Sequence, residues 1–276
     1  MPSDKAGVFS FLPKVFKEDY IQDCWDLWMD EKNGRTYVAV LDGKHVGVIH
    51  VFVEYDYGWL EAIRIHPDYQ RHGIGIQLST MAMDFAKQCG AKRVRLSTSS
   101  ANEKAQSQVK KMGFQELVRF ARPFLENVSP VSAGKNSQKI EWGAIAKYIK
   151  KSECYKNSKG LYATDWRWKP LTEGAIKEFV SMGNFIVHGN NEIDGLLLYR
   201  DSLMLEKNTI EISFVDGTEE GIREVVKGLF SIASQEGKKI YGFVPNEPGI
   251  VEMAKKAGLD LVGRDMIVFE KALTGK

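Results

Sequence analysis

The sequence has few cysteines and no long apolar run, which argues against a disulfide-rich, zinc-binding or membrane-spanning protein. Cys24, Cys89 and Cys154 are scattered, and they show neither CxxC nor Cys/His ligand spacing. They therefore predict neither a disulfide framework nor a zinc site. No apolar stretch approaches the roughly 20 residues that a membrane-spanning helix needs, and Met1 to Asp4 do not begin a signal peptide. We expect a cytoplasmic protein with no metal and no membrane partner.

The sequence also lacks a large excess of charge, because its 276 residues include 38 basic and 36 acidic ones. A net charge of +2 is too small to indicate nucleic acid as a partner. One basic segment with interleaved aromatic residues could still be a patch for RNA or an acidic protein, or the solvated face of a helix. Acidic residues balance basic ones over this half of the chain, which favours the solvated face. The lysines of this segment are Lys139, Lys147, Lys150, Lys151, Lys156 and Lys159.

What is present is a glycine-containing turn, residues 70–75, between an apolar stretch at 60–65 and a helical pattern from 76 to 89. Backbone N–H groups at a helix start lack intrahelical partners and lie at the positive end of the helix dipole. Phosphate oxygens are natural ligands there. A dinucleotide fingerprint would need a third glycine where Leu78 stands, and no Gly-Lys-Ser/Thr follows for a P-loop. The turn predicts a diphosphate cradle of another type.

The pattern Gln70-x-x-Gly73-x-Gly75, after a strand that ends at His66-Pro67, resembles the acyl-CoA signature of the GCN5-related N-acetyltransferase (GNAT) family. The resemblance runs from about Thr36 to Phe120. It includes the hairpin at 37–49, the strand start at 90–96, and an Asn-x-x-Ala motif followed by Gly-Phe at 113–114. It implies acetyl-CoA as acyl donor. The cofactor-binding positions that it implies are Ile63, Arg64, Ile65, Gln70, Arg71, His72, Gly73, Ile74, Gly75, Asn102 and Ala105.

The activity that the resemblance implies is direct transfer of an acetyl group to an amine of a small molecule or peptide in a ternary complex. In the family the pantetheine arm lies beside the central strand, which residues 63–65 match. Glu61 matches a carboxylate that some members use to accept the amine proton through water, and desolvation within an apolar strand would raise its pKa toward a useful range. A structural carboxylate paired with Arg64, Arg95 or a lysine is the alternative. Tyr55 and Tyr57 are weaker candidates for lining the amine channel.

One position departs from the family pattern. Many members have a tyrosine seven residues after the asparagine of Asn-x-x-Ala, and its phenol protonates the departing thiolate; this chain has Val109 there. A CoA thiolate with a pKa near the cysteine reference of about 8.5 is a fair leaving group, so this loss would slow transfer rather than prevent it. Ser107 or a water could substitute. Among the histidines, His72 is expected to lie near phosphate and His66 to be solvated at a strand end.

The second half repeats the pattern of the first in a weaker form. We expect mixed α/β architecture in two tandem acetyltransferase-like domains, residues 1–130 and 140–276, joined by a polar linker at 131–139. Aligning Gly90 with Gly237 places Glu220 opposite Gly73. Carboxylates in the first helical turn occupy the place of a diphosphate. We therefore expect the second domain not to bind CoA and to serve as scaffold, substrate wall or dimer surface.

Two other function classes compete with the transferase. A CoA-binding regulatory or sensor module without turnover would explain Val109, and a non-catalytic scaffold would explain the altered second half. The family often dimerises, which adds a homodimer to the partners that the resemblance implies. Within the first half, a helix over residues 17–29 with a wide apolar stripe is expected to face a core, with an aromatic substrate wall as its alternative.

Overall fold

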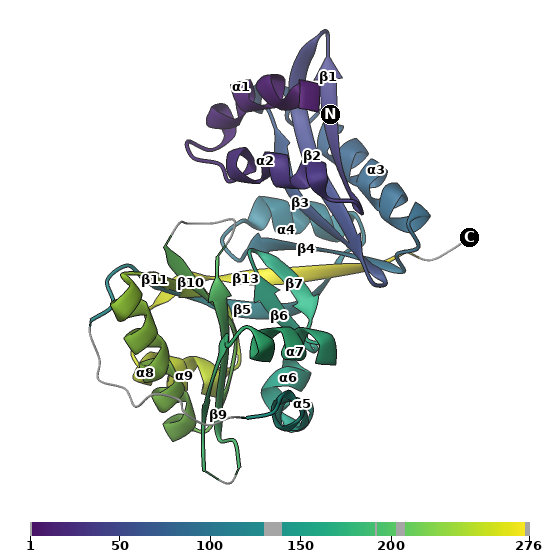
Figure 1. Cartoon of the computed structure of the whole chain (residues 1–276). Coiled ribbons are helices and arrows are strands. Elements are labelled where there is room, and N and C mark those ends of the chain that lie inside the picture. The colour runs from purple at the N-terminus through teal and green to yellow at the C-terminus, as the bar shows by residue number, and fades with distance from the viewer. Residues whose placement is uncertain (1, 130–139, 191, 203–207, 274–276) are drawn as a thin grey trace. The chain divides into compact units, whose positions relative to one another are not determined.

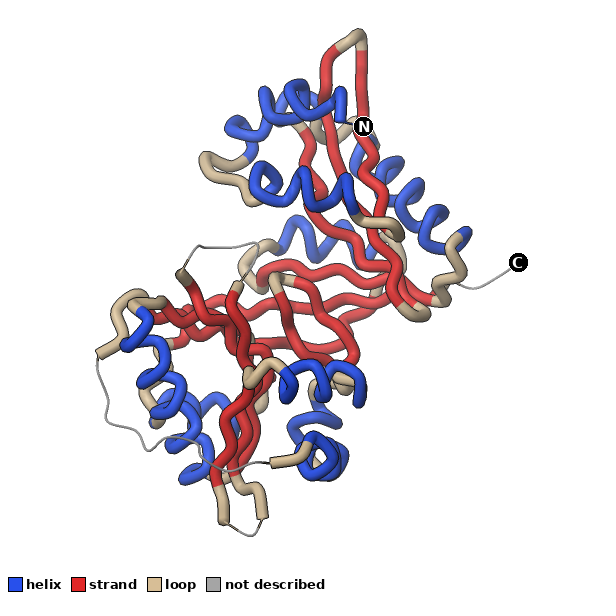
Figure 2. The backbone as a smooth tube through the Cα atoms, viewed as in Figure 1, coloured by secondary structure: helices blue, strands red, loops and turns tan. Residues whose placement is uncertain are grey.

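A computed structural model of the chain describes residues 2–129, 140–190, 192–202 and 208–273. The predicted linker at 131–139 lies outside the described residues. The chain consists of helices and strands in short runs (Figures 1 and 2). Through the first half they are η1 Pro2–Asp4, α1 Lys5–Val15, α2 Ile21–Asp30, β1 Gly34–Leu41, β2 Lys44–Glu54, β3 Tyr57–Ile65, η2 Pro67–Tyr69, α3 Ile74–Gln88, β4 Arg93–Ser99, α4 Glu103–Lys111 and β5 Gln115–Leu125.

The second half carries a similar series after two additional short helices and a small hairpin. Its elements are α5 Trp142–Lys151, α6 Glu153–Asn157, β6 Leu161–Thr164, β7 Arg167–Pro170, α7 Glu173–Ser181, β8 Phe185–His188, β9 Gly195–Asp201, β10 Thr209–Gly217, α8 Glu219–Glu236, β11 Lys239–Gly242, β12 Val244–Pro245, α9 Pro248–Lys256 and β13 Leu261–Ala272. The chain divides into two compact units, and neither is one continuous segment. The first consists of Met1–Thr98, Glu103–Glu116 and Val268–Lys276, and the second of Ser99–Asn102 and Leu117–Ile267.

The first unit is a mixed sheet with helices on both faces. Its strand order is β1-β2-β3-β4-β13, with β1, β2 and β3 antiparallel and β3 parallel to β4. Helices α1 and α2 cover one face and α3 covers the other (Figure 1). The apolar stripe of α2 is core, as expected, because Ile21, Cys24, Trp25 and Trp28 are buried. The helix begins at Ile21, later than the predicted start at residue 17.

A β-bulge interrupts β3 in the middle of the first unit. His50 of β2 pairs with Glu61 and Val48 pairs with Arg64, so two residues of β3 lie opposite the single residue Ile49. Ala62, one of the two, has a left-handed φ of 58°. A bulge of this kind bends a strand and ends its regular pairing. Here it lies where β3 leaves its parallel partner.

The second unit repeats this arrangement, which confirms the tandem architecture. Its strand order is β13-β5-β11-β10-β9-β8; β8 and β9 form a hairpin, and β10 runs parallel to β11 as β3 does to β4. The register shift between Ile212 and Phe214 repeats the bulge of β3. Its core is formed by buried aliphatic residues of β8–β11 and by one face of α8.

Each unit takes its last strand from the other half of the chain. Strand β5 ends the first repeat in sequence, yet it pairs with β11 in the second unit. The end of β13, from Val268, belongs to the first unit, where it neighbours β4. An ion pair accompanies this neighbour relation, because Arg95 Nε of β4 lies 2.7 Å from Glu270 Oε2 of β13.

Candidate functional site: a glycine loop at the start of helix α3

The loop at 70–75 leads from the end of β3 into a helix whose first turn is uncapped. Arg71 and Gly73 both adopt left-handed backbone, with φ of 67° and 78°. Gly73 is the N-cap of α3 and offers no side chain to accept from the first turn. In the part of the chain that the structure describes, the backbone N–H groups of residues 71–75 have no hydrogen-bond acceptor. Free donors at the positive end of a 15-residue helix form an anion-binding arrangement.

Gln70 fixes the loop to its surroundings. Its Nε2 donates to the carbonyl oxygen of Ile65 at 3.2 Å. Its Oε1 accepts from Lys104 Nζ of α4 at 3.0 Å. The side chain thus ties the loop to the end of β3 and to α4. Both of its polar groups are engaged, so Gln70 positions the loop.

Beside this loop, β3 and β4 separate. Their parallel pairing extends over three residue pairs, from Tyr57–Arg93 to Trp59–Arg95. Beyond Trp59, the backbone of β3 no longer pairs with β4 over the residues matched to the pantetheine segment. Ile63 is 39% exposed there, unusual for an isoleucine in the middle of a sheet.

Gly75 is where strand, loop and α4 converge. A Cβ at this position would lie 3.3 Å from Gln108 Nε2, 3.7 Å from Ile63 Cδ1 and 3.7 Å from Ile65 Cγ1. Glycine therefore keeps the first turn of α3 open beside the exposed part of β3. Sequence reasoning missed Gln108, whose only signal was its place one residue before Val109 on α4.

Glu61 lies on the other face of the sheet, the one covered by α2. Its expected structural partners bind other carboxylates: Arg64 Nε lies 2.7 Å from Asp19 Oδ2, and Arg95 pairs with Glu270. Burial and then the charge of Glu61 raise the pKa of the Tyr20 phenol, which places Glu61 within electrostatic range of that ring.

His50 lies opposite Glu61 across the β2–β3 pair. Its ring stacks on Trp28 with centroids 4.5 Å apart. Its Nε2 lies 2.8 Å from Glu31 Oε2 and its Nδ1 lies 2.9 Å from Thr36 Oγ1. Both ring nitrogens have partners, so His50 has a structural role in the packing of α2 on the sheet.

The remaining predicted residues lie on or just before α4 and at the turn between β2 and β3. Asn102 is exposed just before α4, and Ala105 is half-buried within it. Val109 is half-buried on α4, and its carbonyl oxygen accepts from Phe114 N–H. Tyr57 is fully buried with the Arg95 guanidinium 4.8 Å from its ring centroid, so it belongs to the core. Tyr55 is 67% exposed.

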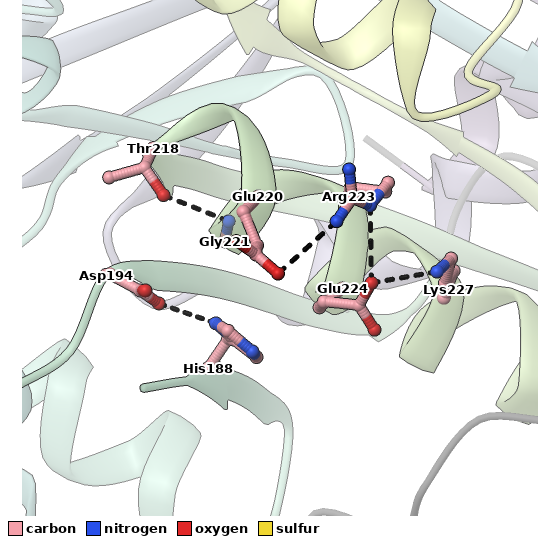
Figure 3. A network of polar contacts seen from close by, with 8 residues as sticks. All are labelled: His188, Asp194, Thr218, Glu220, Gly221, Arg223, Glu224 and Lys227. Atoms are coloured by element: carbon pink, nitrogen blue, oxygen red, sulfur yellow. Dashed lines mark hydrogen bonds and ion pairs between the residues drawn. The ribbon is translucent and has the colours of Figure 1, made fainter. Parts of the chain in front are cut away.

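The corresponding helix of the second unit, α8, has a closed N-terminus. Thr218 is its N-cap, and Thr218 Oγ1 accepts from Gly221 N–H at 3.0 Å (Figure 3). The backbone at the start of β9 lies against the same turn, because a Cβ on Gly221 would overlap the carbonyl oxygen of Asp194. Glu220 Oε1 and Arg223 Nη2 are 3.4 Å apart on the next turn. The alignment that placed Glu220 opposite Gly73 is therefore wrong by two residues, because Thr218 occupies the N-cap position that Gly73 has in α3.

Among the residues that the structure describes, no group of three or more His, Cys, Asp or Glu side chains has a metal-binding arrangement. No described helix combines the length and apolar character needed to cross a membrane.

The first half of the chain matches a known family. Residues 7–114 match the family model described as Acetyltransferase (GNAT) family. No curated protein matches the chain.

Solved structures match over nearly its whole length. A GCN5-related N-acetyltransferase from Sphaerobacter thermophilus is 11% identical with a TM-score of 0.69, over 100% of this chain and 94% of that one. A GCN5-related glucosamine N-acetyltransferase region of a fungal multi-domain GH3 beta-N-acetylglucosaminidase is 17% identical with a TM-score of 0.64, over 97% of this chain and 37% of that one. A tandem GNAT protein from the clavulanic acid biosynthesis pathway is 10% identical with a TM-score of 0.59, over 100% and 96%. At these identities the structures show the fold.

Proposed function

Because residues 7–114 match the GNAT acetyltransferase family model, we propose that the chain transfers an acetyl group from acetyl-CoA to an amine of a small molecule or peptide. The observation that carries this proposal is the uncapped start of α3 behind Gly73, beside a strand that has left its partner. Donors for a diphosphate and an open strand edge for a pantetheine arm then belong to one continuous surface of the first unit.

In this proposal acetyl-CoA is held chiefly by the backbone. The N–H groups of residues 71–75 bind the diphosphate, with Arg71 and His72 beside it, and Gln70 holds the loop in shape. The unpaired edge of β3 at residues 63–65 receives the pantetheine amides as an added strand would. An N–H of this edge polarises the thioester carbonyl, which stabilises the oxyanion that forms when the amine attacks.

Glu61 is the proposed base. A protonated amine cannot attack a carbonyl, so a carboxylate must accept its proton, directly or through water. Glu61 precedes the bulge at Ala62, close in sequence to the strand segment that would hold the thioester. The arginines at 64 and 95 form ion pairs with Asp19 and Glu270.

One observation favours a second function, a sensor that binds acetyl-CoA without turnover. Val109 stands where many family members have the tyrosine that protonates the leaving thiolate, and a valine cannot donate a proton. In the transferase proposal the thiolate leaves without this acid, or with a proton from water or Ser107.

Steady-state release of free CoA thiol separates the two functions. The acceptors would be a diamine, glucosamine and a peptide with a free amino terminus. Glu61→Gln should lower kcat by roughly 10²- to 10⁴-fold and leave the Kd for acetyl-CoA unchanged. Glu18→Gln changes an exposed glutamate between α1 and α2; it is the control and should keep wild-type turnover. Binding of acetyl-CoA without acetylation of any amine would favour the sensor.

For the second unit, we propose that it binds no CoA and supports the first. The capped N-terminus of α8, covered by the backbone of β9, supports this role. A diphosphate there would have to displace Thr218 and approach Glu219 and Glu220 in the first turn.

A further inference from the structure

A pocket with cationic side chains in its lining lies in the first unit, apart from the glycine loop. It encloses about 430 Å³ between α1, the turn that joins β1 to β2, and the segment after β3. None of residues 70–75 lines it. The lining residues that matter here are Ser10, Phe11, Lys14, Lys44, His66 and Tyr69.

His66 forms the wall of this pocket and is buried, contrary to the expectation of a solvated strand-end histidine. Its relative exposure is 8%. Its ring packs edge-on against Tyr69, with centroids 5.4 Å apart, and against Phe11 at 6.1 Å. The two aromatic rings hold the imidazole in one orientation, so its two nitrogens have fixed directions.

The hydrogen bonds of His66 determine which nitrogen carries the proton. Nδ1 accepts from the backbone N–H of Asp68 at 3.2 Å. A neutral imidazole has one acceptor nitrogen and one donor nitrogen, so Nε2 carries the proton. The Nε2–H group is then a donor on the pocket side of the ring.

Lys14 places a second donor beside the first. Its Nζ lies 3.1 Å from His66 Nε2, and an ammonium has three donors and no acceptor. Two donors at hydrogen-bond distance do not satisfy each other. A group that accepts from both resolves the conflict, and two converging donors of this kind are what a carboxylate or phosphate binds in bidentate fashion.

The charges around the pocket agree with an anionic ligand. Lys14 and Lys44 are both in the lining. His45 Nε2 pairs with Asp4 Oδ1 at 3.0 Å. Asp68, the one carboxylate of the lining, has a side chain that is 80% exposed to solvent. The Ser10 hydroxyl donates to the Gly7 carbonyl at 2.7 Å.

We propose that this pocket binds a small oxyanion, a carboxylate or phosphate group, between His66 Nε2–H and Lys14 Nζ, with Lys44 adding charge and Phe11 and Tyr69 giving an apolar wall. The site is separate from the glycine loop and does not depend on the proposed acetyl transfer. Its ligand is either a free anion or the anionic group of a larger molecule whose apolar part rests on the two rings.

The test is nitrogen-15 NMR of the histidine side chains in the full chain. Without ligand, the spectrum should show a proton on His66 Nε2 and an acceptor at Nδ1, as the Asp68 N–H bond requires; a proton on Nδ1 would overturn the proposal. Titration with inorganic phosphate, and separately with acetate, should shift the Nε2 signal saturably. The tighter of the two anions distinguishes a phosphate from a carboxylate ligand.

Two lysine variants test whether the anion that shifts the His66 Nε2 signal binds in this pocket. Lys14→Gln should weaken anion binding at least tenfold. Lys17→Gln changes an exposed lysine just after the end of α1 and outside the lining, and it should leave anion binding unchanged. The titration is repeated with saturating acetyl-CoA and should give the same affinity. Equal weakening in both variants, competition by acetyl-CoA, or no saturable shift would each contradict the proposed site.

Discussion

Arg95 of β4 and Glu270 of β13 form an ion pair across 175 residues of sequence, with Nε and Oε2 2.7 Å apart. The side chain of Arg95 is 9% exposed and that of Glu270 24% exposed. The guanidinium also lies over the Tyr57 ring. The C-terminal strand therefore completes the first unit, the unit that holds the glycine loop.

Glu270→Gln should lower the free energy of unfolding by about 2 kcal/mol, because it leaves a largely buried guanidinium without its counterion. Arg95 Nη1 already lacks a hydrogen-bond partner among the described residues, so the loss is not compensated there. Urea unfolding monitored by tryptophan fluorescence measures it. Asp26→Asn removes an exposed ion pair with Lys5 and should cost less than about 0.5 kcal/mol. Equal losses in the two variants would show that the Arg95 pair is not a structural link.

A buried carboxyl group in the second unit, that of Glu211, should make the free energy of unfolding depend on pH. Burial and then the neighbouring Asp165 carboxylate raise the pKa of Glu211 to about 8. The unfolded chain has its glutamate pKa near 4.3. From about pH 4.5 to pH 8 the unfolded state ionises this group while the folded state keeps it protonated. The contribution of Glu211 to stability is therefore complete at acid pH and is lost as pH rises through this window.

Glu211→Gln should flatten this dependence. The free energy of unfolding of the wild type, measured in urea from pH 5 to pH 8, should fall more steeply than that of the variant. Glu252→Gln changes an exposed glutamate that pairs with Lys256, and it should keep the wild-type slope. A wild-type slope in Glu211→Gln would mean that Glu211 ionises normally in the folded protein.

The N-cap of α8 should be structural. Thr218→Ala removes the acceptor of the Gly221 N–H and should destabilise the protein by about 1 kcal/mol. The variant should still bind one acetyl-CoA in isothermal titration calorimetry, because the β9 backbone continues to cover the helix start. A second bound acetyl-CoA in this variant would show that Thr218 alone blocks a site in the second unit.

Local chemistry made much of the fold predictable. Glycine signalled the turn before α3 because Gly73 adopts a φ of 78°, and helical periodicity identified the buried face of α2. The repeat was visible because both halves place a glycine with positive φ before the strand that follows the long helix, at Gly90 and Gly237.

Long-range pairing was not predictable in the same way. Strands β5 and β13 each join the sheet of the unit formed by the other half of the chain. The two units offer similar neighbouring strands, and no local sequence pattern distinguishes the two possible partners. The burial of His66 depends on Phe11, 55 positions earlier in the sequence. The alignment of Glu220 with Gly73 failed because α8 has 18 residues and α3 has 15, so counting back from Gly237 and Gly90 reaches different points at the two helix starts.

The most direct test of the account is calorimetric titration of acetyl-CoA into the intact chain and two variants, Gly73→Asp and Gly73→Asn. Both side chains tolerate the left-handed backbone of Gly73, and they differ only in charge. We predict one acetyl-CoA per wild-type chain, and at least tenfold weaker binding to Gly73→Asp than to Gly73→Asn, because the carboxylate repels the diphosphate at the start of α3. No binding to the wild type, two sites per chain, or equal affinity in the two variants would contradict the proposed site.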